Sequence, residues 1–486
     1  MKRSLLHTLH KIGLAAAVLL LAFQGNSQQV DFRSMTPEER NAYFAKINAA
    51  SWQDRKQMLG QLGIVLPQLP NDSLDPKRPA HTFKRPGSNN WTDSAGQFYA
   101  QSDWGHWTNY DESKTGTYNL PNPLVAKNGK KITTAKEWWS IRRPEILADY
   151  QVEIFGKIPA NTPKVTFEVV STDSTVLNNT AILKKIVGHI ENANNTPDTP
   201  RIEISLYLPK GTNAPVPLMV RVSEYFDGPP PGSGSQPPGA REQVLALGWA
   251  FATVNTSAIQ ADNGAGLTKG IIGLVNMGQP RKPDDWGVLA AWSWGMSRAM
   301  DYFITDKTID SKRIGIQGHS RWGKTALLTA AYDPRWAIVF PTSSGALGAS
   351  LEKRNFGETI DIVAGSGEYH WMAGNFLKYG GAWEAMPVDA HMLIALIAPR
   401  PVFITGGTQE NWIDTKGEFL ACVAADPVYR LLVKKGLGTT QMPVPDVALI
   451  QGELAFRNHV GGHVDLPNWP TFLLWAQRYF AKPTTR

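Results

Sequence analysis

The chain has 486 residues, of which 42% are hydrophobic and 19% are charged, an ordinary globular composition with room for one large domain and an extension. The formal net charge is +7 at pH 7, but the basic residues are dispersed without long runs, which argues against a nucleic-acid-binding role. The single cysteine, Cys422, excludes an intrachain disulfide, so the core must stabilise the fold.

The first 27 residues have the pattern of a secretory signal peptide. Three basic side chains and no acidic ones occur there, around an apolar run over residues 12–23 that is followed by small residues at 25–27. The run is shorter than the roughly 20 apolar residues of a membrane-spanning helix. We therefore expect residues 1–27 to be removed and the mature protein, periplasmic or secreted, to have no membrane association.

Residues 28–130 are predicted to form an N-terminal extension, helical and irregular, that wraps the core. Thr36 before Pro37 indicates the start of one helix, and a second helical segment is predicted at 52–62. Residues 67–117 are rich in Pro, Gly, Asn, Asp and Ser, which is typical of irregular chain, but several Trp and Tyr side chains there favour packing onto the body.

Residues 131–486 alternate between strand and helix patterns, which predicts an α/β catalytic domain. Early antiparallel strands followed by this alternation favour a three-layer sandwich around a mostly parallel central sheet. A loop rich in Pro and Gly is expected at 227–239. We expect strands at 165–170, 201–208, 216–222, 250–254, 313–317, 337–340, 401–405 and 446–451, and helices near 135–155, 241–247, 287–304, 324–331, 392–397, 415–424 and 470–480.

The segment 314–324 is predicted to be a nucleophile elbow. An apolar run ends in Gly318, Ser320 stands at the bend, and a helix-forming segment follows. Such a turn exposes the serine hydroxyl above a parallel sheet, as in the α/β-hydrolase fold. The spacing departs from Gly-x-Ser-x-Gly, because Trp322 holds the fifth place and Gly323 follows it. The flanking strand and helix still favour Ser320 as a nucleophile.

A histidine late in the chain is expected to be the general base. His459 and His463 lie between the last predicted strand and the last predicted helix, which fits the order nucleophile, acid, base. The glycines at 461 and 462 give His463 an unhindered approach, so we favour it over His459. His319, next to the serine, is expected to pack against the sheet.

The acid that orients this histidine is expected in the loop after the strand 401–405. Glu410 comes first and is preferred, and Asp414 is the alternative. Either carboxylate would set the imidazole tautomer and stabilise the imidazolium.

Two cations, Arg321 and Lys324, follow the serine. One interpretation is that they are solvated surface charges, although cations at a helix N-terminus oppose its dipole. The other is that Arg321, with its backbone N–H, helps hold the developing oxyanion, while Lys324 binds a polar or acidic substrate. An oxyanion donor contributes roughly 3 kcal/mol in the transition state.

At these residues the chain resembles the glucuronoyl esterases, carbohydrate esterase family 15, whose elbow reads Gly-x-Ser-Arg-x-Gly-Lys. The resemblance covers about residues 130–480. It implies an α/β-hydrolase fold, no metal or other cofactor, and cleavage of the ester between the glucuronic acid branches of xylan and lignin alcohols. Further similar segments are 286–295, 354–358, 387–391, 398–401 and 462–463.

The resemblance implies that Ser320 is the nucleophile, His463 the base and Arg321 the oxyanion partner. It implies that Lys324, Glu358 and Trp412 contact the uronic acid sugar. One departure is Ser343, which stands where fungal members carry the triad glutamate, so the acid must come from the later loop, where Glu410 matches bacterial relatives. A second is the segment 223–227, where relatives tend to have a turn rich in Asn and Gly.

These observations predict an exported serine esterase that hydrolyses esters of (4-O-methyl-)glucuronic acid in glucuronoxylan through an acyl-enzyme. We expect a monomer whose partner is this substrate alone. Two alternatives stay open at this stage: an esterase that removes acetyl or other acyl groups from polysaccharides, and a carbohydrate-binding relative with weakened catalysis.

Overall fold

The computed structural model describes residues 35–64, 83–84, 91–92, 98–101, 107–192, 199–212, 215–223, 238–365, 367–380 and 382–481. The predicted signal peptide and nearly all of the predicted loop 227–239 lie outside the described residues.

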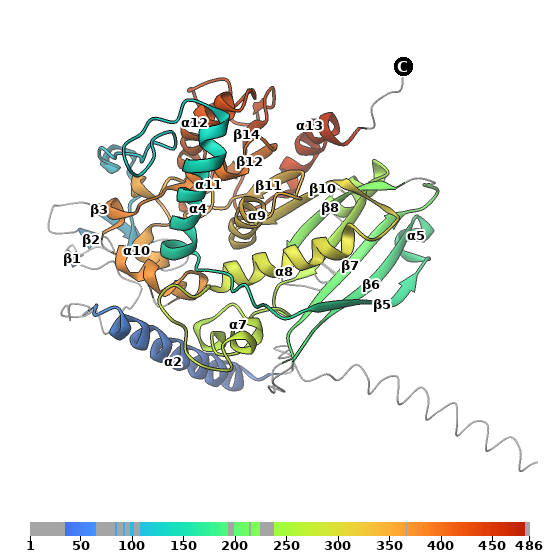
Figure 1. Ribbon diagram of the computed structural model, residues 1–486, viewed down its shortest axis with the longest axis horizontal. Helices are drawn as coiled ribbons and strands as arrows, with labels where there is room; N and C mark the ends of the chain where they lie inside the picture. Colours follow the sequence, from blue (N-terminus) through green and yellow to red (C-terminus); the bar gives the residue numbers. More distant parts are fainter. Residues whose placement is uncertain are drawn as a thin grey trace, which may run out of the picture.

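A ten-stranded sheet runs through the described part of the chain, in the order β13-β14-β12-β11-β10-β8-β9-β7-β6-β5 (Figure 1). The strands from β9 to β14 along this order pair in parallel, whereas β5, β6 and β7 at one end and β13 at the other pair antiparallel. The bounds are β5 Val165–Asp173, β6 Ala181–Ile190, β7 Arg201–Pro209, β8 Val216–Ser223, β9 Ala250–Asn255, β10 Ile309–His319, β11 Ile338–Thr342, β12 Val402–Gly407, β13 Ala448–Leu449 and β14 Leu454–His459.

Both faces of this sheet are apolar and both are covered by helices. Successive residues of a strand point to opposite faces, so Leu218 packs on one side and Met219 on the other. The Met219 side also holds Phe340, whose ring stacks on Phe472 at 4.1 Å between centroids. The first side is covered by α8 (Val288–Phe303), α9 (Arg321–Tyr332), α11 (Ala390–Ile397) and α12 (Thr415–Leu431), and the second by α6 (Ala240–Ala246) and α13 (Trp469–Phe480). The predicted three-layer α/β sandwich is confirmed.

Two strands of the ten-stranded sheet were not predicted, and one predicted strand is nearly absent. In β6, Lys184 and Lys185 interrupt the apolar alternation, and β14 has only three apolar residues before Arg457. The predicted strand 446–451 is wrong for most of its length, since only the two-residue edge strand β13 forms there.

The N-terminal extension contains one long helix, α2 (Pro37–Gln61), where two helices were predicted. No Gly or Pro separates the two predicted segments, so nothing breaks the helix between them. Thr36 caps it as predicted, and Glu39 completes a capping box. Helix α2 packs against the turn Gly264–Gly266, which precedes α7 (Gly270–Val275), in the lower part of Figure 1.

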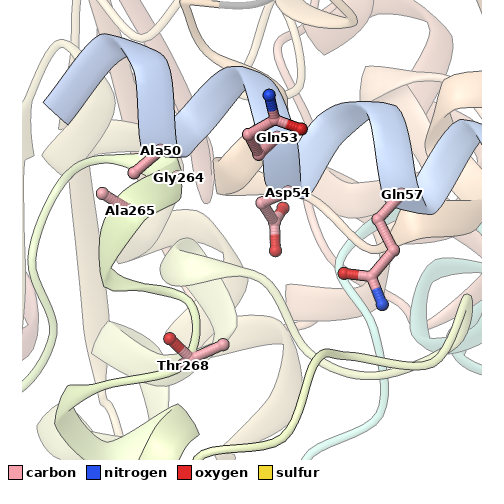
Figure 2. Close-up of a pocket in the computed structure, with 7 residues that line it drawn as sticks. All are labelled: Ala50, Gln53, Asp54, Gln57, Gly264, Ala265 and Thr268. Atoms are coloured by element: carbon pink, nitrogen blue, oxygen red, sulfur yellow. The ribbon is translucent and has the colours of Figure 1, made fainter. Parts of the chain in front are cut away.

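A pocket of about 380 Å³ separates part of α2 from the loop before α7. Asp54 and Gln57 extend from α2 toward this loop in Figure 2. The pocket is lined by Ala50, Gln53, Asp54, Gln57, Gly264, Ala265 and Thr268.

The remaining elements are short or irregular. A helical stretch predicted at 135–155 forms as α3 (Ala135–Glu137), α4 (Arg143–Asp149) and two π-helical turns, Trp138–Arg142 and Tyr150–Ile154. The described part of the chain contains no helix with the length and apolar character to cross a membrane. Other elements are α5 (Val176–Asn179), α10 (Ile360–Val363) and a small antiparallel sheet of β1 (Phe83–Lys84), β2 (Trp91–Thr92), β3 (Phe98–Gln101) and β4 (Trp107–Thr108).

Candidate active site

Ser320 stands at the turn between β10 and α9, as the sequence predicts. Its backbone has φ 59° and ψ −130°, a conformation that costs a non-glycine residue about 1–3 kcal/mol. The Ser320 N–H donates to Thr342 O at 2.9 Å, which ties the turn to the end of β11. Tertiary contacts thus hold Ser320 in the strained conformation of a nucleophile elbow.

The two glycines of the elbow are required by close backbone approach. A Cβ at Gly318 would lie 2.0 Å from Trp322 O. A Cβ at Gly323 would lie 3.0 Å from Ser344 Cβ and 3.1 Å from Gly318 O. Position 323 therefore leaves little room for a side chain, which fits a glycine one place later than in the usual pattern.

His463 and Glu410 meet beside this turn. His463 Nδ1 hydrogen-bonds Glu410 Oε1, and Glu410 Oε2 accepts from Ser343 Oγ at 2.8 Å and from Gly407 N–H at 3.0 Å. Burial alone would raise the pKa of Glu410, but the hydrogen bond and charge of His463, with the bonds from Ser343 and Gly407, bring it below its ordinary value. Glu410 is thus held as a carboxylate against the imidazole.

Ser343 accounts for the departure noted in the sequence. It follows β11 directly, and its hydroxyl donates to the same carboxylate that holds His463. The loops after β11 and β12 therefore converge on one point. The carboxylate at that point comes from position 410.

His319 links the imidazole to the elbow. Its ring lies 4.2 Å from the ring of His463 between centroids, and its Nδ1 is 3.1 Å from Thr342 Oγ1, so it packs against the sheet as expected. Burial and the neighbouring His463 charge lower the pKa of His319 to about 4. His319 is therefore neutral near pH 7, and its contact places His463 next to the residue that precedes Ser320.

The alternative acid, Asp414, and the alternative base, His459, make hydrogen bonds to other groups. Asp414 caps α12 through Gly417 N–H at 3.0 Å and pairs with Arg354 Nε at 2.8 Å. His459 is buried at the end of β14, with Nε2 3.1 Å from Gly462 O and Nδ1 3.0 Å from Asn468 Nδ2. Both side chains shape the loops that carry Glu410 and His463.

Lys324 is buried, contrary to the interpretation as a surface charge. Its side chain is 2% exposed, and its ammonium donates to Ser344 O at 2.8 Å, Ala346 O at 2.6 Å and Glu358 Oε2 at 2.6 Å. Glu358 N–H in turn donates to Trp412 O at 2.7 Å. The three residues predicted to contact the sugar are thus brought together.

Arg321 is placed differently, with 41% of its side chain exposed. Its Nη1 is 2.5 Å from Asp262 Oδ2, and its guanidinium carbon lies 5.6 Å from the centroid of the Trp371 ring. Lys324 Nζ lies 5.7 Å from the same ring. Asp262 and Trp371 were not predicted, although the position of Asp262, in the loop after a predicted core strand, was a usable signal.

The loop that carries His463 is also anchored from its far side. Asp465 Oδ2 accepts from Arg221 Nη2 at 2.7 Å, on β8, and from Gln317 Nε2 at 3.2 Å, on β10.

Among the described residues, no group of three or more His, Cys, Asp or Glu side chains is arranged to hold a metal ion.

Comparison with known proteins gives consistent matches. The family model for glucuronyl esterases of fungi matches residues 192–433. A carbohydrate esterase from an unknown prokaryotic organism is 32% identical over 406 residues, which cover 76% of this chain and 92% of that protein. The 4-O-methyl-glucuronoyl methylesterase of Cerrena unicolor is 28% identical over 373 residues, 75% of this chain and 68% of that protein. A solved CE15 glucuronoyl esterase from Teredinibacter turnerae T7901 superposes with a TM-score of 0.74 at 37% identity, covering 89% of this chain and all of that one.

Proposed function

The chain belongs to the glucuronoyl esterases of carbohydrate esterase family 15, and from this we propose that it hydrolyses esters of 4-O-methyl-glucuronic acid with Ser320 as the nucleophile. The observation that carries the mechanism is the Glu410–His463 pair beside the Ser320 turn. A carboxylate on Nδ1 sets the tautomer in which Nε2 is free to accept a proton from a serine.

Acylation follows from this arrangement. His463 Nε2 takes the Ser320 hydroxyl proton as Oγ attacks the ester carbonyl carbon, and Glu410 stabilises the imidazolium that forms. The oxyanion of the tetrahedral intermediate is held by the Arg321 backbone N–H and its guanidinium. Collapse of the intermediate breaks the bond to the alcohol, which leaves with the proton from His463.

Deacylation repeats the steps with water. His463 removes a proton from a water molecule as the water oxygen attacks the acyl-enzyme carbonyl. His463 then returns this proton to Ser320 Oγ as the bond to the serine breaks, and the uronate leaves. The alcohol portion contributes only the leaving oxygen to this scheme.

Recognition of the uronic acid is assigned to Lys324, Glu358 and Trp412. The Glu358 carboxylate, held in a fixed position by Lys324 Nζ at 2.6 Å, offers an acceptor that suits sugar hydroxyls, and an indole ring suits the face of a sugar. We propose that the natural substrate is the ester between glucuronoxylan and lignin alcohols, and that residues 1–27 direct export.

Hydrolysis of a benzyl ester of glucuronic acid, compared with an aryl acetate, tests this function. We expect a clear preference in kcat/KM for the glucuronate, and a loss in kcat of roughly 10⁴-fold or more in Ser320→Ala. The variant should unfold at the wild-type temperature. Preference for the acetate would instead indicate a general acyl esterase, and unchanged activity in Ser320→Ala would refute the serine mechanism.

A further inference from the structure

The guanidinium of Arg321 needs a partner to hold it in place. A long side chain that is 41% exposed samples many rotamers, and fixing it costs up to about 2 kcal/mol of side-chain entropy. An oxyanion donor is effective only if it is oriented before the charge develops. Asp262 contacts this guanidinium directly, through Oδ2 at 2.5 Å from Nη1.

Asp262 is itself fixed by two ring donors. Its other oxygen, Oδ1, is 2.9 Å from His370 Nε2 and accepts from Trp371 Nε1 at 2.6 Å. The two Asp262 oxygens thus divide their contacts, one toward the turn Tyr369–Trp371 and one toward Arg321. The Trp371 ring also lies 5.6 Å from the guanidinium carbon, so the same side chain contacts both members of the ion pair.

The negative charge next to Arg321 lies on the Asp262 carboxylate. Burial would raise its pKa, but the hydrogen bond and charge of His370 and the charge of Arg321 hold it well below its ordinary value. Glu368 also senses Arg321, but burial and the neighbouring Glu358 raise its pKa to about 8, so it is largely protonated near pH 7. Asp262 is therefore the carboxylate that balances Arg321 under neutral conditions.

We infer that Asp262 is a positioning residue, which orients the Arg321 guanidinium toward the oxyanion that develops at Ser320. The inference rests on the proposed function, because it presupposes an acyl-transfer transition state. Since the guanidinium acts on a charge that is absent from the bound ester, loss of Asp262 should reduce kcat and leave KM nearly unchanged.

A double-mutant cycle with Arg321 tests this inference. We expect Asp262→Asn to lower kcat by about 10- to 100-fold on the benzyl glucuronate ester, with KM changed less than threefold. In an Arg321→Gln background the same substitution should have almost no further effect, since both remove one interaction. The matched control is Asp306→Asn, which removes an ion pair with Lys184 of 2.8 Å near the opposite end of β10 and should leave kcat unchanged.

Fully independent effects of Asp262→Asn and Arg321→Gln on kcat would overturn the inference. If Asp262→Asn does not fold, Trp371→Phe removes one donor to the same carboxylate and keeps a ring under the guanidinium. Its loss in kcat should likewise vanish in the Arg321→Gln background, and persistence there would contradict the inference.

A second readout does not depend on ester hydrolysis. In ¹⁵N-arginine-labelled protein, the guanidinium signal that Arg321→Gln removes should report an ordered group in the wild type and a mobile one in Asp262→Asn. Equal mobility in the two proteins would refute positioning by Asp262, even with the ester assay intact. An ordered guanidinium in a wild type that does not cleave the glucuronate would refute the proposed function instead.

Discussion

Glu410 and Asp414 are four residues apart, and their contacts give them different tasks. Glu410 contacts His463 and is fixed by Ser343. Asp414 pairs with Arg354, and burial raises its pKa to about 6 in spite of that cation. The first carboxylate faces the proposed base, and the second holds a helix end.

The two tasks predict different losses on amide substitution. Glu410→Gln should lower kcat by about 10³- to 10⁴-fold, because the imidazole loses the carboxylate that sets its tautomer. Asp414→Asn should lower kcat less than tenfold but reduce the free energy of unfolding by about 1–3 kcal/mol, because Arg354 loses a buried charge partner. Steady-state kinetics and urea unfolding measure these effects. A folded Asp414→Asn protein with the larger loss in kcat would reverse the assignment.

A third carboxyl group, Glu418, lies fully buried beneath the site. Its Oε1 accepts from Ser344 N–H at 2.9 Å and from Gly345 N–H at 3.2 Å, which fixes the loop that carries Ser343. Burial, and next the charge of Glu410, raise the pKa of Glu418 well above its ordinary value. The folded protein therefore keeps this group protonated where the unfolded chain would ionise it.

This proton makes stability depend on pH in a predictable direction. Above about pH 4.5 unfolding releases the Glu418 proton, so its contribution to stability is fully present below that pH and is lost as pH rises toward the folded-state pKa, by up to about 1.4 kcal/mol per pH unit. Gln cannot ionise. We expect the difference in free energy of unfolding between Glu418→Gln and the wild type to shift in favour of the variant as the pH rises from 5 to 8, measured by urea unfolding. A difference that stays constant over this range would contradict protonation of Glu418.

At the scale of elements, α2 supports the loop that carries Asp262. Ala265 N–H donates to Ser51 Oγ at 3.0 Å, and Tyr369 Oη donates to Ser51 O at 2.7 Å. The loop on one side of Asp262 and the turn on its other side are thus both attached to one helix of the extension. Gly264 lies at the tightest point of this contact.

Gly264→Ala should loosen this contact. A Cβ there would lie 2.2 Å from Tyr369 Oη and 2.9 Å from Ser51 Cβ, and the tyrosine cannot retreat without losing its hydrogen bonds. We expect a destabilisation of about 1–3 kcal/mol in urea unfolding, together with a lower kcat. Gly60→Ala, in α2 with open space around it, is the control and should be neutral or stabilising by up to about 1 kcal/mol. Equal effects of the two substitutions would show that α2 does not brace the loop.

The elements were predictable where local pattern and tertiary environment agree. The elbow and the later core helices follow from apolar runs and turn residues that keep the same meaning in the fold. Strand β14 was missed because burial between two helical layers lets a strand end in Arg, Asn and His. The place of Asp262 in the loop after a core strand could have marked it as a candidate, but its pairing with Arg321, 59 residues away, could not be read from a local pattern.

At the scale of the whole molecule, the predicted extension and the predicted catalytic part share contacts near the candidate sugar site. Gly357 N–H donates to Asn109 O at 3.1 Å, one residue before Glu358. Glu112 pairs with Arg354 and, at 2.5 Å, with Lys416. The domain boundary near residue 130 stays a prediction. Arg354 links the two predicted parts, because it contacts Glu112 of the extension and Asp414 of the catalytic part.

The two ion pairs of Arg354 should differ greatly in their contribution to stability. Arg354 and Asp414 are 3% and 2% exposed, so Arg354→Met leaves a buried carboxylate without its cation and should cost about 3–5 kcal/mol. Glu112 is 49% exposed, and Glu112→Gln should cost less than about 1 kcal/mol because solvent screens the pair. Urea unfolding of both variants measures the difference.

The double substitution Arg354→Met with Asp414→Asn separates the charge effect from lost packing. It removes both buried charges at once, so it should recover part of the stability lost in Arg354→Met. No recovery would mean that the methylene stem of Arg354, rather than its charge, joins the extension to α12. Recovery with a raised KM for the glucuronate ester would show that this junction also shapes the loop that carries Trp412.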